Sequence, residues 1–162
     1  MRLLIDLMHF ALLFLAVAVT ATIGDDGAVT GTTVVASTPD VVRSKVGDPA
    51  WVATIGGAET DVIVAAVDGD CQVLDYVSHH AIATARYRVK QCPSADGFVA
   101  NLVESDAFSF YRTSWSVIPA DEGTRLLYRI ELVSTLPVPK WIVRRSTRSS
   151  VEHMMESIAK AL

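Results

Sequence analysis

Residues 71–92 read CQVLDYVSHHAIATARYRVKQC, and the alternation of apolar and polar side chains in this stretch decides the fold class. The period of two predicts two β-strands, 71–78 and 82–91. A hairpin that turns between residues 81 and 82 gives each position a chemically suitable partner: Cys71 with Cys92, Leu74 with Val89, Asp75 with Arg88, and Tyr76 with Tyr87. We therefore expect an antiparallel hairpin in this register.

Alternation also assigns the two faces of this hairpin. The inner face carries Leu74, Tyr76, Ala85, Tyr87 and Val89, whereas the outer face carries Cys71, Asp75, Arg86, Arg88, Lys90 and Cys92. The chain has 2 cysteines, and an even count favours one disulfide, Cys71–Cys92, in an oxidising compartment.

The rest of the chain extends the same pattern on both sides of the hairpin. Five further strands are predicted at 29–36, 61–67, 98–104, 108–118 and 125–133, and two short helices at 41–46 and 50–55. A type I′ turn at Asp68-Gly69 would pair Val67 with Asp70. The last segment, 139–162, has apolar residues at helical spacing: Val151, Met154, Met155, Ile158 and Leu162.

Together these elements predict an α+β fold. We expect a curved antiparallel sheet of about seven strands, wrapped on one long C-terminal helix, with two short helices after the first strand. The apolar concave face of this sheet must pack against another element, and the segment 139–162 is the long helix that can do so.

Five short motifs in this order resemble the START-like, or helix-grip (SRPBCC), superfamily. They are Ser37-Thr38-Pro39-Asp40-Val41-Val42, Asp48-Pro49-Ala50-Trp51, the strand from Tyr111 to Pro119, Gly123-Thr124-Arg125-Leu126-Leu127-Tyr128, and Leu136-Pro137-Val138-Pro139. The resemblance covers about residues 28–162 and is nearest to the polyketide cyclase/dehydrase and coenzyme Q-binding branches. It implies a fold that binds apolar ligands, without naming a ligand or establishing catalysis.

The N-terminal segment 1–24 is typical of a secretory signal peptide. Arg2 precedes an apolar run over 7–19, and Val19-Thr20-Ala21 is a tolerable cleavage triplet. An uncleaved N-terminal anchor is the alternative, because the run approaches the length that spans a bilayer. We expect 25–162 to be a ligand-binding domain, secreted or periplasmic, or else tethered to the outer side of a membrane.

Candidate cavity-lining residues come from the inner faces of the strands and from the helix stripe. They are Leu74, Tyr76, Ala85, Tyr87, Tyr111, Thr113, Trp115, Tyr128, Ile130, Val151, Met155 and Ile158. Each could simply fill the core. The four inward tyrosines favour a pocket, because every buried hydroxyl needs a hydrogen-bonding partner and apolar neighbours offer few.

The formal net charge is −4 and a basic surface is lacking overall, which disfavours nucleic acid. The sequence contains none of the usual hydrolase, zinc-protease, P-loop or dinucleotide motifs, and we expect no cofactor or metal. One basic cluster stands out: Lys140, Trp141, Arg144, Arg145 and Arg148. It is either a solvated helix face or a contact for anionic lipid headgroups.

These observations favour an exported domain that binds a small apolar molecule, lipid or isoprenoid-like, between the sheet and the C-terminal helix. Two alternatives stay open: an exported cyclase/dehydratase-type enzyme that uses the same pocket, and a non-catalytic interaction domain with a filled core. Catalysis ranks below binding, because no nucleophile, base and orienting group occur within one motif.

Overall fold

The computed structural model describes residues 18–56, 59–79 and 83–162. In chain order the elements are β1 (Thr20–Ile23), β2 (Val29–Val35), α1 (Pro39–Val46), α2 (Pro49–Ile55), β3 (Glu59–Asp68), β4 (Cys71–His79), β5 (Thr84–Pro93), β6 (Gly97–Ser105), β7 (Phe108–Ala120), β8 (Gly123–Ser134) and α3 (Lys140–Ala161). The predicted order of strands and helices is confirmed, with one additional strand at the start.

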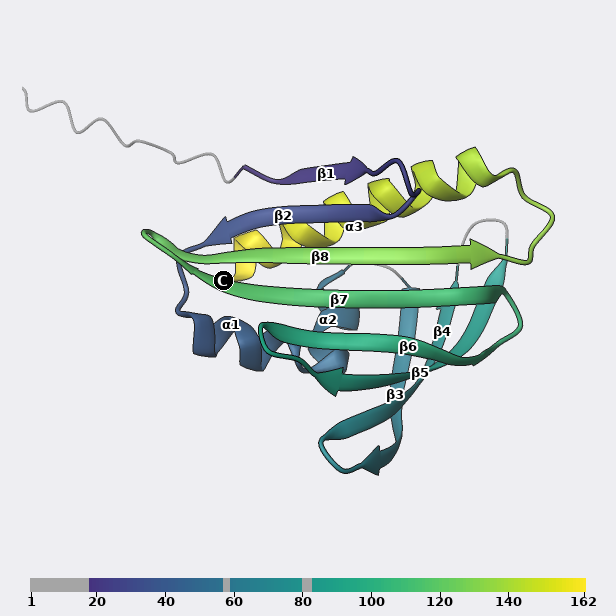
Figure 1. The fold of residues 1–162 in the computed structure, drawn as a ribbon, viewed down its shortest axis with the longest axis horizontal. Coiled ribbons are helices and arrows are strands. Elements are labelled where there is room, and N and C mark those ends of the chain that lie inside the picture. Colours follow the sequence, from purple (N-terminus) through teal and green to yellow (C-terminus); the bar gives the residue numbers. More distant parts are fainter. Residues whose placement is uncertain (1–17, 57–58, 80–82) are drawn as a thin grey trace, which may run out of the picture.

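The strands form one curved antiparallel sheet in the order β1-β2-β8-β7-β6-β5-β4-β3 (Figure 1). Helix α3 runs along the β1–β2–β8 end of the sheet (Figure 1), whereas α1 packs against β7 near its middle and α2 packs against β3 at its other end. The predicted α+β helix-grip arrangement is therefore confirmed, with eight strands in place of about seven.

The central hairpin adopts the predicted register. Tyr76 lies opposite Tyr87, and Cys71 and Cys92 form the disulfide that continues the ladder. Arg88 donates two hydrogen bonds to the Asp75 carboxylate, at 2.6 and 2.9 Å. The complementary pairs read from the sequence thus correspond to contacts in the fold.

The predicted turn between β3 and β4 is wrong. Asp68 pairs with Cys71 and Val67 with Gln72, so the turn residues are Gly69 and Asp70. Gly69 has φ +61°, and none of the described non-glycine residues has a positive φ. A type I′ turn at Asp68-Gly69 would need a positive φ at Asp68 as well, whereas glycine at the first central position is typical of a type II′ turn.

Helix α3 approaches the sheet closely at Gly31 of β2. A Cβ atom at Gly31 would lie 2.6 Å from Val151 Cγ1 and 2.8 Å from Met155 Cγ, so a larger residue would push the helix away. Val151, Met155 and Ile158 are buried against this part of the sheet, in the main hydrophobic core. The helix stripe predicted from the sequence is therefore the face that packs.

Strand β1 falls within the predicted leader segment, 1–24. Thr20–Ile23 pairs along its whole length with β2, and Ala21 is only 6% exposed within the core. The turn that follows is held by Asp26, which accepts hydrogen bonds from the backbone N–H of Ala28 at 3.0 Å and from Arg129 Nη2 at 2.6 Å.

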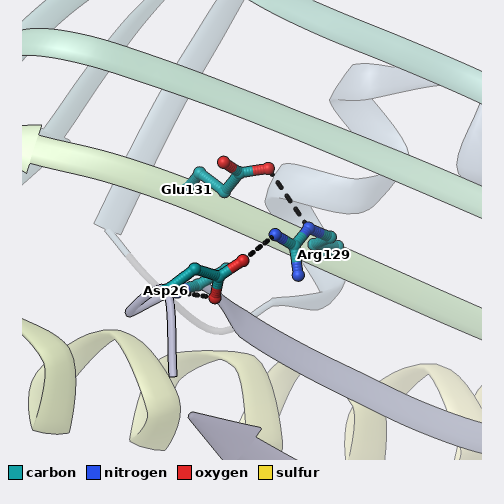
Figure 2. Close-up of polar contacts among 4 residues, drawn as sticks. Asp26, Arg129 and Glu131 are labelled. Carbon is teal, nitrogen blue, oxygen red and sulfur yellow. Dashed lines mark hydrogen bonds and ion pairs between the residues drawn. The ribbon is translucent and has the colours of Figure 1, made fainter. Parts of the chain in front are cut away.

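Figure 2 shows Arg129 of β8 between Asp26 and Glu131, whose Oε1 accepts from Arg129 Nε at 3.1 Å. The β1–β2 turn is thereby tied to the outer face of the sheet. Residues 1–17, which hold most of the predicted leader, lie outside the described part of the chain. Within 18–56, 59–79 and 83–162, no helix is long and apolar enough to cross a membrane.

Candidate functional site

A cavity of about 680 Å³ lies between the concave face of the sheet and the three helices. This volume is within the range of about 300–1,000 Å³ that is usual for small-molecule sites. The strands contribute Thr60, Tyr76, Ser78, Ala85, Tyr87, Val89, Gln91, Ala100, Phe108, Tyr111, Thr113, Trp115, Tyr128, Ile130, Leu132 and Ser134. The helices and the loop before α3 contribute Val46, Pro49, Val52, Ala53, Leu136, Val138, Ile142, Val143, Ser146, Thr147, Ser149, Ser150, Val151, His153 and Met154.

The structure sorts the predicted site residues into two groups. Those that border the cavity are Tyr76, Ala85, Tyr87, Tyr111, Thr113, Trp115, Tyr128, Ile130 and Val151. Leu74, Met155 and Ile158 do not border it, because they are fully buried by their neighbours. Leu74 packs with Val89 and Ala100, while Met155 and Ile158 fill the contact between α3 and the sheet. Ligand contact stays a prediction for both groups.

The strand side of the cavity is an aromatic wall. Tyr76 and Tyr87 are stacked with ring centroids 5.1 Å apart, and Tyr111 is tilted against Tyr87 at 5.0 Å. Trp115 and Tyr128 form a second tilted pair at 4.4 Å. The chain has 4 tyrosines, and all of them border this one cavity.

The hydroxyl groups of this wall bond to one another. The Oγ atoms of Thr60 and Ser78 are 3.2 Å apart, and Ser78 Oγ is 3.4 Å from Tyr87 Oη. Ser78 continues the inner face of β4 two residues beyond Tyr76, so strand alternation alone could have identified it as a lining residue. The result is a polar strip along an otherwise apolar surface.

Burial keeps the tyrosines of this wall neutral. It is the largest cause of the raised pKa of Tyr76, Tyr111 and Tyr128. Burial also raises the pKa of Tyr87, although hydrogen bonding with Ser78 and Tyr111 opposes part of that rise. Each phenol can therefore donate or accept a hydrogen bond, but it is a weak acid and is not available as a base.

The helix side of the cavity is apolar inside and polar at its edge. Ile142, Val143 and Val151 face the cavity with little or partial exposure, whereas Ser146 and Ser150 border the cavity and are exposed. The exposed serines place the opening beside the N-terminal half of α3. The apolar stripe predicted from the sequence begins at Val151 and does not include this half of the helix.

Phe108 also borders the cavity, although it is not among the lining residues predicted from the sequence. Strict alternation along β7 would turn it away from Tyr111, but the register of β7 with β8 shifts between Phe108 and Phe110. The shift brings Phe108 to the cavity, where its ring lies 5.4 Å from Tyr87 and 5.5 Å from Tyr111. Nothing in the local sequence marks this irregularity.

The basic cluster lies on the surface of α3 and does not border the cavity, and Arg144 lies beside Gly27 in the turn between β1 and β2. All five of its residues (Lys140, Trp141, Arg144, Arg145 and Arg148) are exposed, and Trp141 is 64% exposed.

No group of three or more His, Cys, Asp or Glu side chains in the described part of the chain is arranged to hold a metal ion.

Three solved structures share this architecture at low sequence identity. A START superfamily protein from Mycobacterium smegmatis has a TM-score of 0.71 at 18% identity, covering 83% of this chain and 95% of that one. The Zhui aromatase/cyclase from a Streptomyces species has a TM-score of 0.66 at 17% identity, with coverages of 83% and 89%. A STAR-related lipid transfer protein from Xanthomonas axonopodis has a TM-score of 0.61 at 12% identity, with coverages of 90% and 91%.

No protein-family model matches the chain, and no curated protein matches it in sequence. The structural similarities show that the chain has a START-like, helix-grip fold. At these identities the similarity concerns the fold alone.

Proposed function

We propose that this protein binds a small apolar molecule, lipid or isoprenoid-like, in the cavity between the sheet and α3, and that it does so outside the cytoplasm. The observation that carries the proposal is the cavity of about 680 Å³, bordered by apolar side chains and by a strip of neutral hydroxyls. A filled core, as in a pure interaction domain, would have left no such space.

Burial of apolar surface supplies the binding free energy. A ligand that loses about 300 Å² of apolar surface to the cavity gains about 7.5 kcal/mol, before the entropic cost of association is subtracted. The hydroxyls of Tyr87 and its neighbours then orient the ligand, because each hydrogen bond adds about 0.5–1.5 kcal/mol and is directional. The lipid transfer protein with the same fold supports binding of this kind.

The basic cluster supports ligand exchange at an anionic membrane surface. Arg144 and Arg148 lie one turn apart on α3, and Lys140 and Trp141 begin the same helix. Basic residues near an anionic leaflet contribute about 1 kcal/mol each, and tryptophan favours the interface. A protein held there would lie with α3, which forms one wall of the cavity, next to the lipids.

Export through the apolar N-terminal leader completes the proposal, with cleavage ahead of β1 because Thr20–Ile23 is paired with β2. A disulfide is compatible with an oxidising compartment, and Cys71–Cys92 is formed in the fold. The mature domain would be secreted or periplasmic, or tethered if the apolar run is not removed.

The direct test is to identify what the protein carries. Full-length protein is expressed with its leader, purified from the exported fraction without detergent, and extracted with organic solvent for mass spectrometry. We expect a stoichiometric apolar compound. Its absence, together with no change in tryptophan fluorescence on titration with an apolar probe, would contradict the proposal.

Membrane exchange is tested separately with vesicles. Sedimentation with vesicles that contain anionic lipid should retain the wild type, and Arg144→Gln/Arg148→Gln should retain less. Arg86→Gln/Arg125→Gln is the matched control, because it removes two exposed cations from strands outside the cluster. Equal retention of all three proteins would remove the membrane step and leave ligand binding in place.

A further inference from the structure

The cavity wall is polar without being charged. Among the described residues that border the cavity there is no Asp, Glu, Lys or Arg, and His153 is the titratable residue besides the tyrosines. His153 is exposed on α3, at the edge of the cavity. A charged group in the cavity away from this edge would therefore have no described ionic partner.

Arg88 and Lys90 of β5 form ion pairs outside the cavity. Arg88 of β5 bonds to Asp75 and to Glu104 at 3.0 Å, and Lys90 bonds to Asp68 at 2.6 Å. These pairs lie on the outer face of the sheet, opposite to Tyr87 and Val89. They stabilise the convex surface and do not offer a counter-ion to a ligand inside.

The raised pKa values of the tyrosines show that the cavity wall destabilises a negative charge. Loss of hydration is the largest cause of the raised pKa of Tyr76, Tyr111 and Tyr128, so the wall disfavours the phenolate anion. The same loss of hydration would act on a carboxylate or a phosphate placed against this wall. A neutral group avoids this cost.

The hydroxyl strip matches neutral oxygen groups in particular. Each hydroxyl of Thr60, Ser78 and Tyr87 can both donate and accept, and they already bond to one another at 3.2 and 3.4 Å. An alcohol, ketone or ester oxygen can join such a strip without leaving an unpaired donor or a net charge. A pure hydrocarbon would leave the hydroxyls as they are and gain nothing from them.

We propose that the cavity selects uncharged ligands that carry a hydroxyl or carbonyl oxygen, and that it excludes carboxylates and phosphates from its interior. This inference rests on the proposed binding function and names its ligand class. It predicts that a fatty acid enters only in its protonated form, whereas the corresponding alcohol binds at any pH at which the protein is folded.

The test compares matched ligands that differ at one end. A long-chain alcohol, the carboxylate of the same length and the corresponding hydrocarbon each compete with an apolar fluorescent probe on the full exported protein. We expect the alcohol to bind at least about 10-fold more tightly than the carboxylate at neutral pH. Affinity for the acid should rise by about 10-fold per unit as the pH falls toward its pKa.

Two variants connect this selectivity to the wall. Tyr87→Phe should lower the affinity for the alcohol by about 2- to 12-fold, because one neutral hydrogen bond is lost. The affinity for the hydrocarbon should not change. Ser114→Ala, which removes a hydroxyl from the opposite face of β7, should leave all three ligands unchanged. Retained affinity for the alcohol in Tyr87→Phe would contradict the role of the strip.

The outcomes separate this inference from the function on which it rests. A carboxylate that binds as tightly as the alcohol, without dependence on pH, would overturn the selectivity and leave apolar ligand binding intact. If neither the probe nor any of the three ligands binds, the proposed function itself fails, and the selectivity fails with it.

Discussion

Replacing Ala85 by phenylalanine should abolish ligand binding without unfolding the protein. Ala85 is 2% exposed and borders the cavity, next to Tyr87 on β5 and opposite Ser78 on β4. Burial of the added ring is worth about 1.5–3 kcal/mol, and strain in a packed site costs about 1–3 kcal/mol. Because the cavity provides about 680 Å³ of space, we expect little strain and a change in stability within about 1.5 kcal/mol.

The matched control is the same substitution at Ala107. This residue is 1% exposed and does not border the cavity, and its backbone N–H donates to Ser105 Oγ at 2.9 Å. Its carbonyl accepts from the Thr135 N–H at 2.9 Å. A phenylalanine here has no free space to occupy, so overpacking should cost about 1–3 kcal/mol and lower Tm by about 2–12 °C.

Thermal melts with and without an apolar probe measure both effects. At a concentration of about 100 times its Kd, the probe should stabilise the wild type by about 2.7 kcal/mol, or about 5–11 °C in Tm. The Ala85→Phe variant should melt within about 6 °C of the unliganded wild type and show no shift with the probe. A variant that is as unstable as Ala107→Phe, or that keeps the full shift, would refute the reasoning.

The remaining predictions concern the bridge, the tyrosines and the N-terminus. Replacing Cys71 and Cys92 together by serine should lower the free energy of unfolding, measured in urea, by about 3 kcal/mol. An unchanged free energy would show that the disulfide does not stabilise the fold. At pH 10.0, the ordinary pKa of tyrosine, near-UV absorbance should show less phenolate in the folded protein than in the unfolded chain, because burial raises the pKa of all four tyrosines. The unfolded chain releases these protons first, so stability should fall as the pH rises above 10.0, and a normal titration of the folded protein would contradict burial. Mass spectrometry of exported protein should find a mature chain that begins at or before Val19, because β1 pairs with β2 and Val19 packs on the core; a stable product that begins after Ile23 would show that β1 is dispensable.

Sequence patterns identified the faces of the strands well. The inner positions of β4 and β5 followed from an alternation that complementary partners confirmed, such as Asp75 with Arg88. A wrong register would have placed these groups on opposite faces, so the pairs and the periodicity constrained each other.

The same patterns do not indicate which residues of an inner face are covered by other side chains and which border the cavity. Leu74 and Tyr76 point to the same side of β4, yet Leu74 is covered by Val89 and Ala100 whereas Tyr76 borders the cavity. Which inward residue is covered depends on how the neighbouring strands pack against it, and the periodicity of one strand does not contain that information.

Local irregularities account for the other differences. The segment Thr20–Ile23 follows the apolar run without a turn signal, so its sequence is typical of a leader, although it pairs with β2. The shift at Phe108 and the turn at Gly69 each depend on one backbone position. Such positions are set by the tertiary fold and leave little trace in the sequence.

The chemistry of the wall favours a carrier over a catalyst. Acid–base catalysis works best when the catalytic group has a pKa near the working pH, and burial moves the tyrosines of this wall away from that range. A neutral tyrosine can still polarise a carbonyl group, so a cyclase-type reaction would have to rely on folding a reactive chain against the hydroxyl strip. In that case Tyr87→Phe would reduce turnover much more than ligand affinity, whereas in a carrier the variant changes affinity alone.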